Sequence, residues 1–280
     1  MIEFLLEHLV LFVLLFVTYL GLEAIEAKGK GALESFLKRA RAIGPFVGGL
    51  LGAVPQCGFS AVAASLYSGG VITLGTIIAV FLSTSDELIP VLLSAKGVES
   101  ALVLKIVGIK IALATIVGFT VNAFIILING KNSPVIDVGS LCEHSHCHCG
   151  EHRGILIPAL IHTLEIFIFI LIVSGSLAVA KHYFGTEFFA TLQMSKPVIG
   201  EMIASALGLI PNCAVSVAFA QLYAEEVIGA GALMASSFSG CGVGLLVLFR
   251  TNRNFKANIL ILVFVYILSI LLGLIGGALL

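Results

Sequence analysis

Long apolar segments make up most of the chain, and three polar stretches interrupt them. The polar stretches cover residues 26–41, 129–153 and 181–197. A transmembrane helix needs about 20 consecutive apolar residues, so the roughly 220 residues outside these stretches allow about ten membrane crossings. The pattern therefore predicts an all-α polytopic membrane protein with about ten spans.

Each half of the chain has the same order of predicted elements: an apolar helix, a charged loop, a region of interrupted helices and a closing helix. The first apolar stretch begins with Glu3 and Glu7 and lacks a basic head, so we expect a retained helix and not a cleaved signal. We expect the outer helices at 4–25, 108–128, 155–180 and 259–280, and the interrupted regions at 43–94 and 198–249. The predicted units are a first transmembrane repeat (1–128), a connecting loop (129–153) and a second transmembrane repeat (154–280).

The division into repeats comes from an internal similarity at an offset of 156 residues. A Pro-polar-Cys motif occurs at 55–57 and again at 211–213, and 11 of the 33 positions from 55 to 87 are identical to their counterparts. Pro55 and Pro211 cannot continue a helix without losing a backbone hydrogen bond. Paired broken helices at matching positions of two halves are typical of a transporter's substrate site. The alternative is a proline kink in a purely structural helix.

The relative orientation of the repeats depends on how often each interrupted region crosses the membrane. An odd number makes the repeats inverted; an even number makes them parallel. Basic residues favour the cytoplasmic side. The inverted arrangement places 10 of the 15 Lys and Arg residues in the cytoplasmic loops 26–42, 129–153 and 250–256, and the parallel one places 13 on one side. The count favours parallel repeats. We nevertheless expect inverted ones, with Lys105 and Lys110 snorkelling from a helix towards the interface.

Composition excludes the soluble classes of function. Hydrophobic residues make up 59% of the chain and charged residues 11%, with a mean hydropathy of +1.14. An average protein carries about 25% charged residues. So few charges cannot cover a soluble enzyme, a nucleic-acid-binding protein or a disordered chain. We expect a multi-pass protein of the cell membrane, with the lipid bilayer and no nucleic acid as partner.

Polar residues at membrane depth are the first candidates for a substrate site. Ser85, Asp86 and Glu87 follow a nearly unbroken apolar helix, and acidic side chains in a bilayer are costly enough to suggest a function. They could bind a cation or carry protons. The alternative is a solvated turn at the level of the headgroups. The second repeat has Cys241 with flexible glycines at the same place.

Thiols next to the helix breaks are the second group of candidates. Cys57 and Cys213 occupy equivalent positions, and thiolates suit copper, zinc or trivalent arsenic better than magnesium or calcium. Gln56 and Asn212 add neutral oxygens beside them. The alternative is that each cysteine is a small buried hydrophobe. Elsewhere, Glu201 is a candidate proton carrier, and residues 225–226 are expected in a solvent-exposed turn.

The connecting loop is rich in metal-binding side chains. Thiolate and imidazole are the preferred ligands of zinc and its neighbours, and three of the six Cys and four of the seven His lie within residues 142–152. The expected ligands are Cys142, His144, His146, Cys147, His148, Cys149 and His152. The spacing matches no standard zinc finger. We expect a scavenging or sensing role, with the loop on the cytoplasmic side; a disulfide or an incidental tract are the alternatives.

A family resemblance rests on the residues at the first break. The motif 55–58, the Leu66-Tyr67 pair and the Phe-Leu-Ser-Thr-Ser-Asp-Glu run at 81–87 resemble the manganese and heavy-metal exporters with about ten transmembrane helices, and more distantly the arsenical permeases. The resemblance implies metal efflux, ten spans in two repeats and Cys57 as the substrate thiol. Phe59 stands where the permeases carry a second cysteine, which weakens an arsenic assignment.

These observations predict a secondary transporter that exports manganese or another divalent transition metal in exchange for protons. No Walker-type loop is present in the sequence, so neither ATP nor a cofactor is expected. Efflux of arsenite or an organoarsenical is the alternative. A membrane thiol oxidoreductase lacks its Cys-x-x-Cys pair, and a structural subunit does not explain the duplicated breaks.

Overall fold

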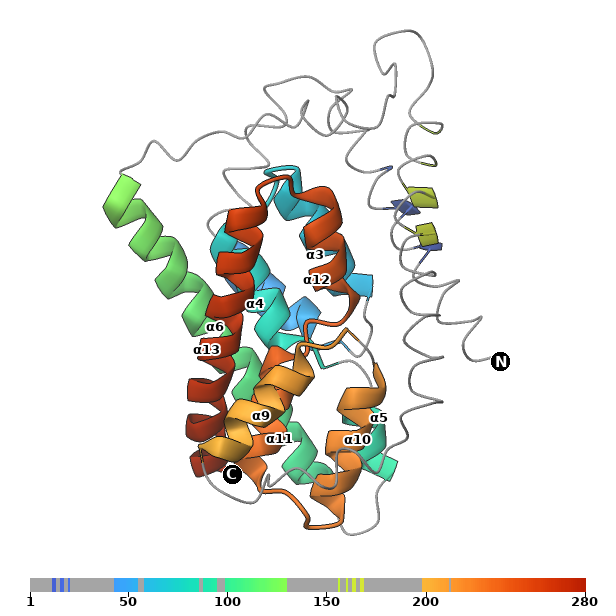
Figure 1. Cartoon of the computed structure of the whole chain (residues 1–280), viewed down its shortest axis with the longest axis vertical. Coiled ribbons are helices and arrows are strands. Elements are labelled where there is room, and N and C mark those ends of the chain that lie inside the picture. Colours follow the sequence, from blue (N-terminus) through green and yellow to red (C-terminus); the bar gives the residue numbers. More distant parts are fainter. Residues whose placement is uncertain are drawn as a thin grey trace, which may run out of the picture.

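The computed structural model describes residues 43–54, 58–85, 88–94, 99–129, 198–211 and 213–280, with isolated helical positions within 12–20 and 156–168. All regular structure in these residues is α-helical (Figure 1). The helices of the first half are Ile43–Gly52, α3 (Gly58–Ser68), α4 (Leu74–Ser83), α5 (Leu88–Ser94) and α6 (Ser100–Asn129). Those of the second half are α9 (Ile199–Gly208), α10 (Cys213–Ala224), α11 (Ala230–Ser239), α12 (Val243–Thr251) and α13 (Phe255–Leu279).

Three stretches of the described residues are long and apolar enough to cross a membrane: Ser100–Ile128, Ala230–Thr251 and Phe255–Leu279. The second comprises α11 and α12, which are separated by a break at 240–242. The chain is therefore a polytopic membrane protein, and its described residues contain helices and no strands. The helix predicted at 108–128 begins earlier, at Ser100. Its two lysines do not interrupt it, because lysine is a good helix former.

The helix Ile43–Gly52 and α3 form a hairpin that enters the protein and returns. Glycines allow Ile43–Gly52 to lie directly against α4: a Cβ on Gly44 would lie 2.3 Å from Thr76 Oγ1, and one on Gly52 would lie 2.1 Å from Ser83 Oγ. These contacts run in chain order, so the two helices point the same way. A short turn joins the end of α3 directly to the start of α4. Consequently α3 runs back, and the tip of the hairpin lies near the C-terminal end of α4.

A second hairpin, made of α9 and α10, has the same relation to α11. A Cβ on Gly208 would lie 2.1 Å from Ser239 Oγ, near the end of α11, and one on Gly231 would lie 2.4 Å from Glu201 Oε1, near its start. The turn after α10 leads straight into α11. The two predicted breaks thus fall between the paired helices of two hairpins, Ile43–Gly52 with α3 and α9 with α10.

The hairpins enter from opposite ends of the helical bundle, and the helices that follow them, α4 and α11, contact each other in its middle. Figure 1 shows α6 and α13 running in opposite directions, with α4 descending to the middle and α11 rising to it. Each hairpin also packs across the molecule: α3 lies against α12, and α10 against α5. Gly244 of α12 lies against the backbone of Ser60, and Ser68 Oγ lies 2.7 Å from Thr251 Oγ1.

One face of α6 is buried and the other is apolar and exposed. The buried positions are Val103, Ile106, Lys110, Ala114 and Gly118, which repeat every three or four residues as expected for one helix face. On the other face, Leu104 is 74% exposed and Leu127 is 82% exposed. Such a surface is suited to contact with lipid chains. Between the parts of the outer helices that the structure describes, Phe12 meets Phe167 edge to face, with ring centroids 5.1 Å apart.

Candidate functional site

Lys110 lies where the two interrupted spans break. Its side chain is fully buried. The ammonium donates hydrogen bonds to the carbonyl oxygen of Thr84 (2.5 Å), the carbonyl oxygen of Ser237 (3.0 Å) and the Oγ of Ser237 (2.6 Å). Thr84 is the C-cap of α4, and Ser237 lies in the last turn of α11. One side chain of α6 therefore joins the broken ends of two helices from different halves.

The convergence of two helix C-termini explains why a lysine is tolerated here. The last four carbonyls of a helix have no partner within it, and the helix dipole places roughly half a negative charge at that end. Thr84 O and Ser237 O both belong to such ends. The ring of Phe238, whose centroid lies 5.8 Å from Lys110 Nζ, presents further negative potential. The middle of the protein is thus a cation-binding environment, and the Lys110 ammonium occupies it.

The expectation that Lys110 snorkels to the interface is wrong. Its neighbours on the buried face, Ile106 and Ala114, point inwards with it, and oxygen acceptors lie within reach in the interior. Lys105 belongs to the exposed face of the same helix. The sequence carries no clear signal for this orientation, because α6 is apolar on its exposed face as well as on its buried face, and hydrophobic periodicity therefore does not mark which side faces the interior.

Two of the sequence-predicted substrate ligands can be placed close to this convergence along the chain. Ser85 follows Thr84 directly, is buried, and donates its hydroxyl to Ser83 O at 3.1 Å. Cys241 follows α11 and is 1% exposed. Cys213 is the first residue of α10, at the tip of the second hairpin. The other predicted ligands lie outside the described residues: Gln56, Cys57, Asp86, Glu87 and Asn212.

The metal ligands predicted in the loop also lie outside the described residues; these are Cys142, His144, His146, Cys147, His148, Cys149 and His152. Among the residues that the structure does describe, no three His, Cys, Asp or Glu side chains are grouped so as to hold a metal ion. The predicted ligand sets at the breaks and in the loop therefore stay predictions.

Glu201 is a second buried ionisable group, at the start of α9. The residue is 8% exposed, and its Oε2 has no hydrogen-bond partner in the described part of the chain. The other oxygen, Oε1, faces Gly231 in the first turn of α11. The predicted exposed turn at 225–226 is confirmed, since both glutamates there are exposed. Glu201 is thus the carboxylate of this region that lies inside the protein.

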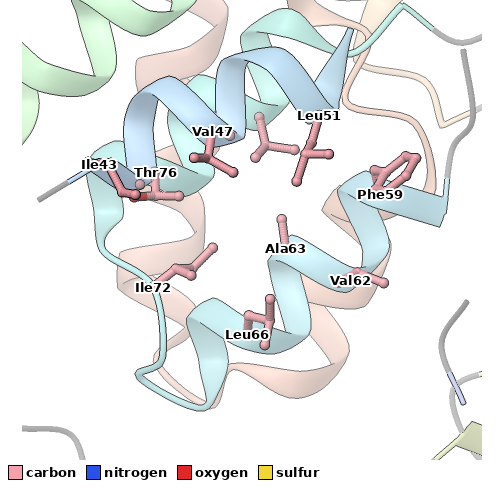
Figure 2. Close-up of a pocket in the computed structure, with 12 residues that line it drawn as sticks. Ile43, Val47, Leu51, Phe59, Val62, Ala63, Leu66, Ile72 and Thr76 are labelled. Carbon is pink, nitrogen blue, oxygen red and sulfur yellow. The ribbon is translucent and has the colours of Figure 1, made fainter. Parts of the chain in front are cut away.

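A cavity of about 330 Å³ lies within the first hairpin, between Ile43–Gly52, α3 and α4 (Figure 2). Its lining is apolar except for Thr76, whose hydroxyl lies 2.9 Å from the hydroxyl of Thr73. Ile43, Val47 and Leu51 at its edge are exposed. The cavity offers no ligand set for a metal ion, so the polar convergence around Lys110 is the better candidate for the functional site.

Comparison with known proteins gives one result. No curated protein and no solved structure matches the chain. A family model matches residues 9–204, which include the first hairpin, α4 to α6 and the connecting loop, and end within α9. This match covers well over half of the 280 residues. The chain belongs to the membrane protein family described as "putative, 10TM heavy-metal exporter".

Proposed function

We propose that this protein exports a divalent transition-metal cation, manganese or one of its neighbours, by alternating access around the convergence at Lys110. The observation that carries the proposal is the meeting of the C-terminal ends of α4 and α11 on one buried cation. Half-helix ends of this kind coordinate cations in secondary transporters. The family description supports the class of substrate, heavy metals.

The moving parts in this proposal are two inverted repeats. The helices support it: Leu74 and Ala230, which begin α4 and α11, and Ser83 and Ser239, which end them, are each 156 positions apart. The Gly52–Ser83 contact has its counterpart at the same offset in Gly208–Ser239. Each repeat contributes one broken helix end to the site, α4 in the first and α11 in the second, so rocking one repeat against the other would open the site to alternate sides.

The connecting loop is proposed to face the cytoplasm. Arg250, Arg253 and Lys256 lie around the connection between α12 and α13, and the C-terminal end of α6 lies at the same end of the bundle (Figure 1). The connection between α10 and α11, which contains two exposed glutamates, lies at the opposite end. Basic residues mark the cytoplasmic side. On that side the His and Cys residues of 142–152 would collect metal before export.

The proposed ligands combine oxygen and sulfur. Ser85, Asp86 and Glu87 follow the end of α4, and Cys241 follows the end of α11. Cys57 and Cys213, with Gln56 and Asn212, belong to the tip motifs of the hairpins. Thiolates favour softer metals and carboxylates favour harder ones. If Cys57→Ser with Cys213→Ser exports normally while Asp86→Asn does not, the site is an oxygen site and the thiols are not ligands.

Glu201 is the proposed proton carrier for exchange. Its burial inside the protein and its unpartnered Oε2 support this role, because ionisable residues inside membrane proteins commonly mark ion and proton pathways. The helices around Glu201 bring no second charge close to it. No other charged residue occurs in α9 or α11. The one charged residue of α13, Lys256, lies at the opposite end of that helix from Gly277, which packs on Gly231. Glu201→Gln is expected to leave metal binding unchanged and to remove the dependence of efflux on an imposed pH gradient. Gradient-driven efflux equal to that of the wild type would contradict this role.

The function is tested in a host that lacks its own metal exporters. The protein is expressed, and growth and cell content are measured for manganese, zinc, copper, iron and arsenite. We expect a lower cell content of at least one divalent metal. Lower arsenite alone would favour the permease alternative, and unchanged content of every ion would contradict export. Replacing 142–152 with a Gly/Ser linker of equal length is expected to weaken export without abolishing it.

A further inference from the structure

The Lys110 ammonium and the three oxygens around it are the most completely built polar cluster among the described residues. Each donor distance is 3.0 Å or less, and the acceptors come from both halves of the chain. A buried charge in a membrane protein is costly and is usually retained for a function. The position on α13 that corresponds to Lys110, 155 residues later, is Val265, which is also fully buried. Helix packing at this place therefore does not in itself require a lysine.

We propose that Lys110 is a tethered cation that occupies the metal's place and must be displaced for the metal to bind. This rests on the proposed function. The oxygens that hold the ammonium, Thr84 O, Ser237 O and Ser237 Oγ, are hard ligands of the kind that manganese and magnesium accept. Two unit charges about 4 Å apart repel strongly even at an effective dielectric constant of 20. The ammonium and a divalent ion therefore exclude each other from this cluster.

This competition gives Lys110 two effects on transport. In the metal-free protein it bridges α4 and α11 and replaces the missing charge at their converging C-termini. When metal has bound, the displaced ammonium raises the free energy of the occupied state and so speeds release. Lys110 is also a specificity-determining residue in this scheme. Only an ion that carries enough charge and binds these oxygens tightly enough can displace the ammonium. A weakly bound monovalent ion would not do so.

The test compares four proteins purified in detergent: wild type, Lys110→Met, Lys110→Arg and Lys105→Met. Lys105 is the matched control because it is an exposed lysine on the same helix. Equilibrium binding of radioactive manganese or zinc and initial transport rates in proteoliposomes are measured. We expect Lys110→Met to lower the metal Kd by about tenfold or more and to lower kcat, because the competitor is gone and release is slow. Lys110→Arg and Lys105→Met should stay within about twofold of wild-type Kd.

A merely structural lysine would behave differently. Removing it would lower the thermal stability and leave the metal Kd unchanged or raise it. That result would overturn the proposal. Should Lys110→Met fail to fold, Lys110→Gln retains donors for the same oxygens without the charge, and the same tightening of Kd is expected. A wild-type protein that neither binds nor transports any metal would instead contradict the proposed function.

A measurement on the wild type alone completes the test. Acetylation of lysines by acetic anhydride is followed by mass spectrometry, with and without saturating manganese or zinc. Displacement from its oxygens should increase labelling of Lys110 severalfold while labelling of Lys105 stays constant. Equal labelling of Lys110 in both conditions, with metal bound, would overturn the proposal.

Discussion

The long helices α6 and α13 occupy comparable places in the fold, yet they carry different chemistry. Both are buried along one face, at Val103, Ile106, Lys110, Ala114 and Gly118 in α6 and at Asn258, Ile261, Val265, Ser269 and Gly273 in α13. Each residue of the second set follows its counterpart by 155 positions. Gly118 lies against Ala79 of α4, and Gly273 lies against Ala235 of α11.

The packing framework and the buried site are therefore under different constraints. Small residues recur at the same places in both helices because they allow close packing, as in other membrane helices. The charged residue occurs in α6 but not at its counterpart in α13. The halves can therefore share a scaffold while only one of them contributes the buried cation that joins their broken helices.

The largest expected effect comes from placing a second cation at the α13 position. Val265→Lys buries a charge where the wild type has an apolar side chain. An uncompensated buried charge costs about 3–5 kcal/mol, so we expect loss of most folded protein. The yield of monodisperse protein and the thermal unfolding midpoint in detergent measure this, with Val265→Met as the size-matched control. Wild-type stability of Val265→Lys would mean that α13 offers equivalent acceptors and that the site is symmetric.

An intermediate effect is expected at the glycines that bring each hairpin against its neighbour. A Cβ on Gly52 would lie 2.6 Å from Val80 O, and one on Gly208 would lie 2.4 Å from Ser236 O. Overpacking of this kind costs about 1–3 kcal/mol. Gly52→Ala and Gly208→Ala should therefore destabilise the protein by similar amounts in thermal unfolding.

The control for this pair is Gly108, whose Cβ would meet nothing within 4 Å. Gly108→Ala is expected to be neutral or to stabilise α6 by up to about 1 kcal/mol, because alanine is the better helix former. A large difference in unfolding temperature between the Gly52→Ala and Gly208→Ala variants would show that the two hairpins do not pack in the same way.

The smallest effect on stability is expected at the N-cap residues of α4 and α11. Thr73 caps α4 by accepting from Thr76 N at 3.2 Å, whereas Gly229, 156 positions later, provides no side-chain cap for α11. Gly229 has an extended backbone and open space around it. Gly229→Ser is expected to raise the free energy of unfolding by a few tenths of a kcal/mol, and Thr73→Ala to lower it by about 1 kcal/mol. A destabilised Gly229→Ser protein would show that the two helix starts differ in more than the cap.

Much of the fold could be predicted from the sequence. Apolar length predicted the membrane class, and the prolines in the Pro-polar-Cys motifs predicted breaks that lie between Ile43–Gly52 and α3 and between α9 and α10. These features are local, because proline alters the backbone at its own position. The start of α6 at Ser100 lies eight residues before the predicted start at 108.

The site was less predictable, because it depends on contacts between distant segments. The sequence pattern predicts thiol and carboxylate ligands at the breaks. The convergence that the structure describes consists of Lys110, the backbone carbonyl of Thr84, and the backbone carbonyl and hydroxyl of Ser237. Backbone carbonyls carry no signature in a sequence. Whether a lysine snorkels or points inwards depends on which face of its helix is buried, and that follows only from the packing of α6 on α4.

The position of the bound metal shows whether the convergence at Lys110 is the transport site. Crystals of the wild-type protein grown with the exported metal are measured at its absorption edge, so that anomalous scattering locates the ion. We expect one strong site in the middle of the bundle, between the end of α4 at Thr84 and Ser85 and the end of α11 at Ser237, with the Lys110 ammonium moved away. Metal bound only within 142–152, with Lys110 still hydrogen-bonded to Thr84 and Ser237, would contradict a transport site at this convergence.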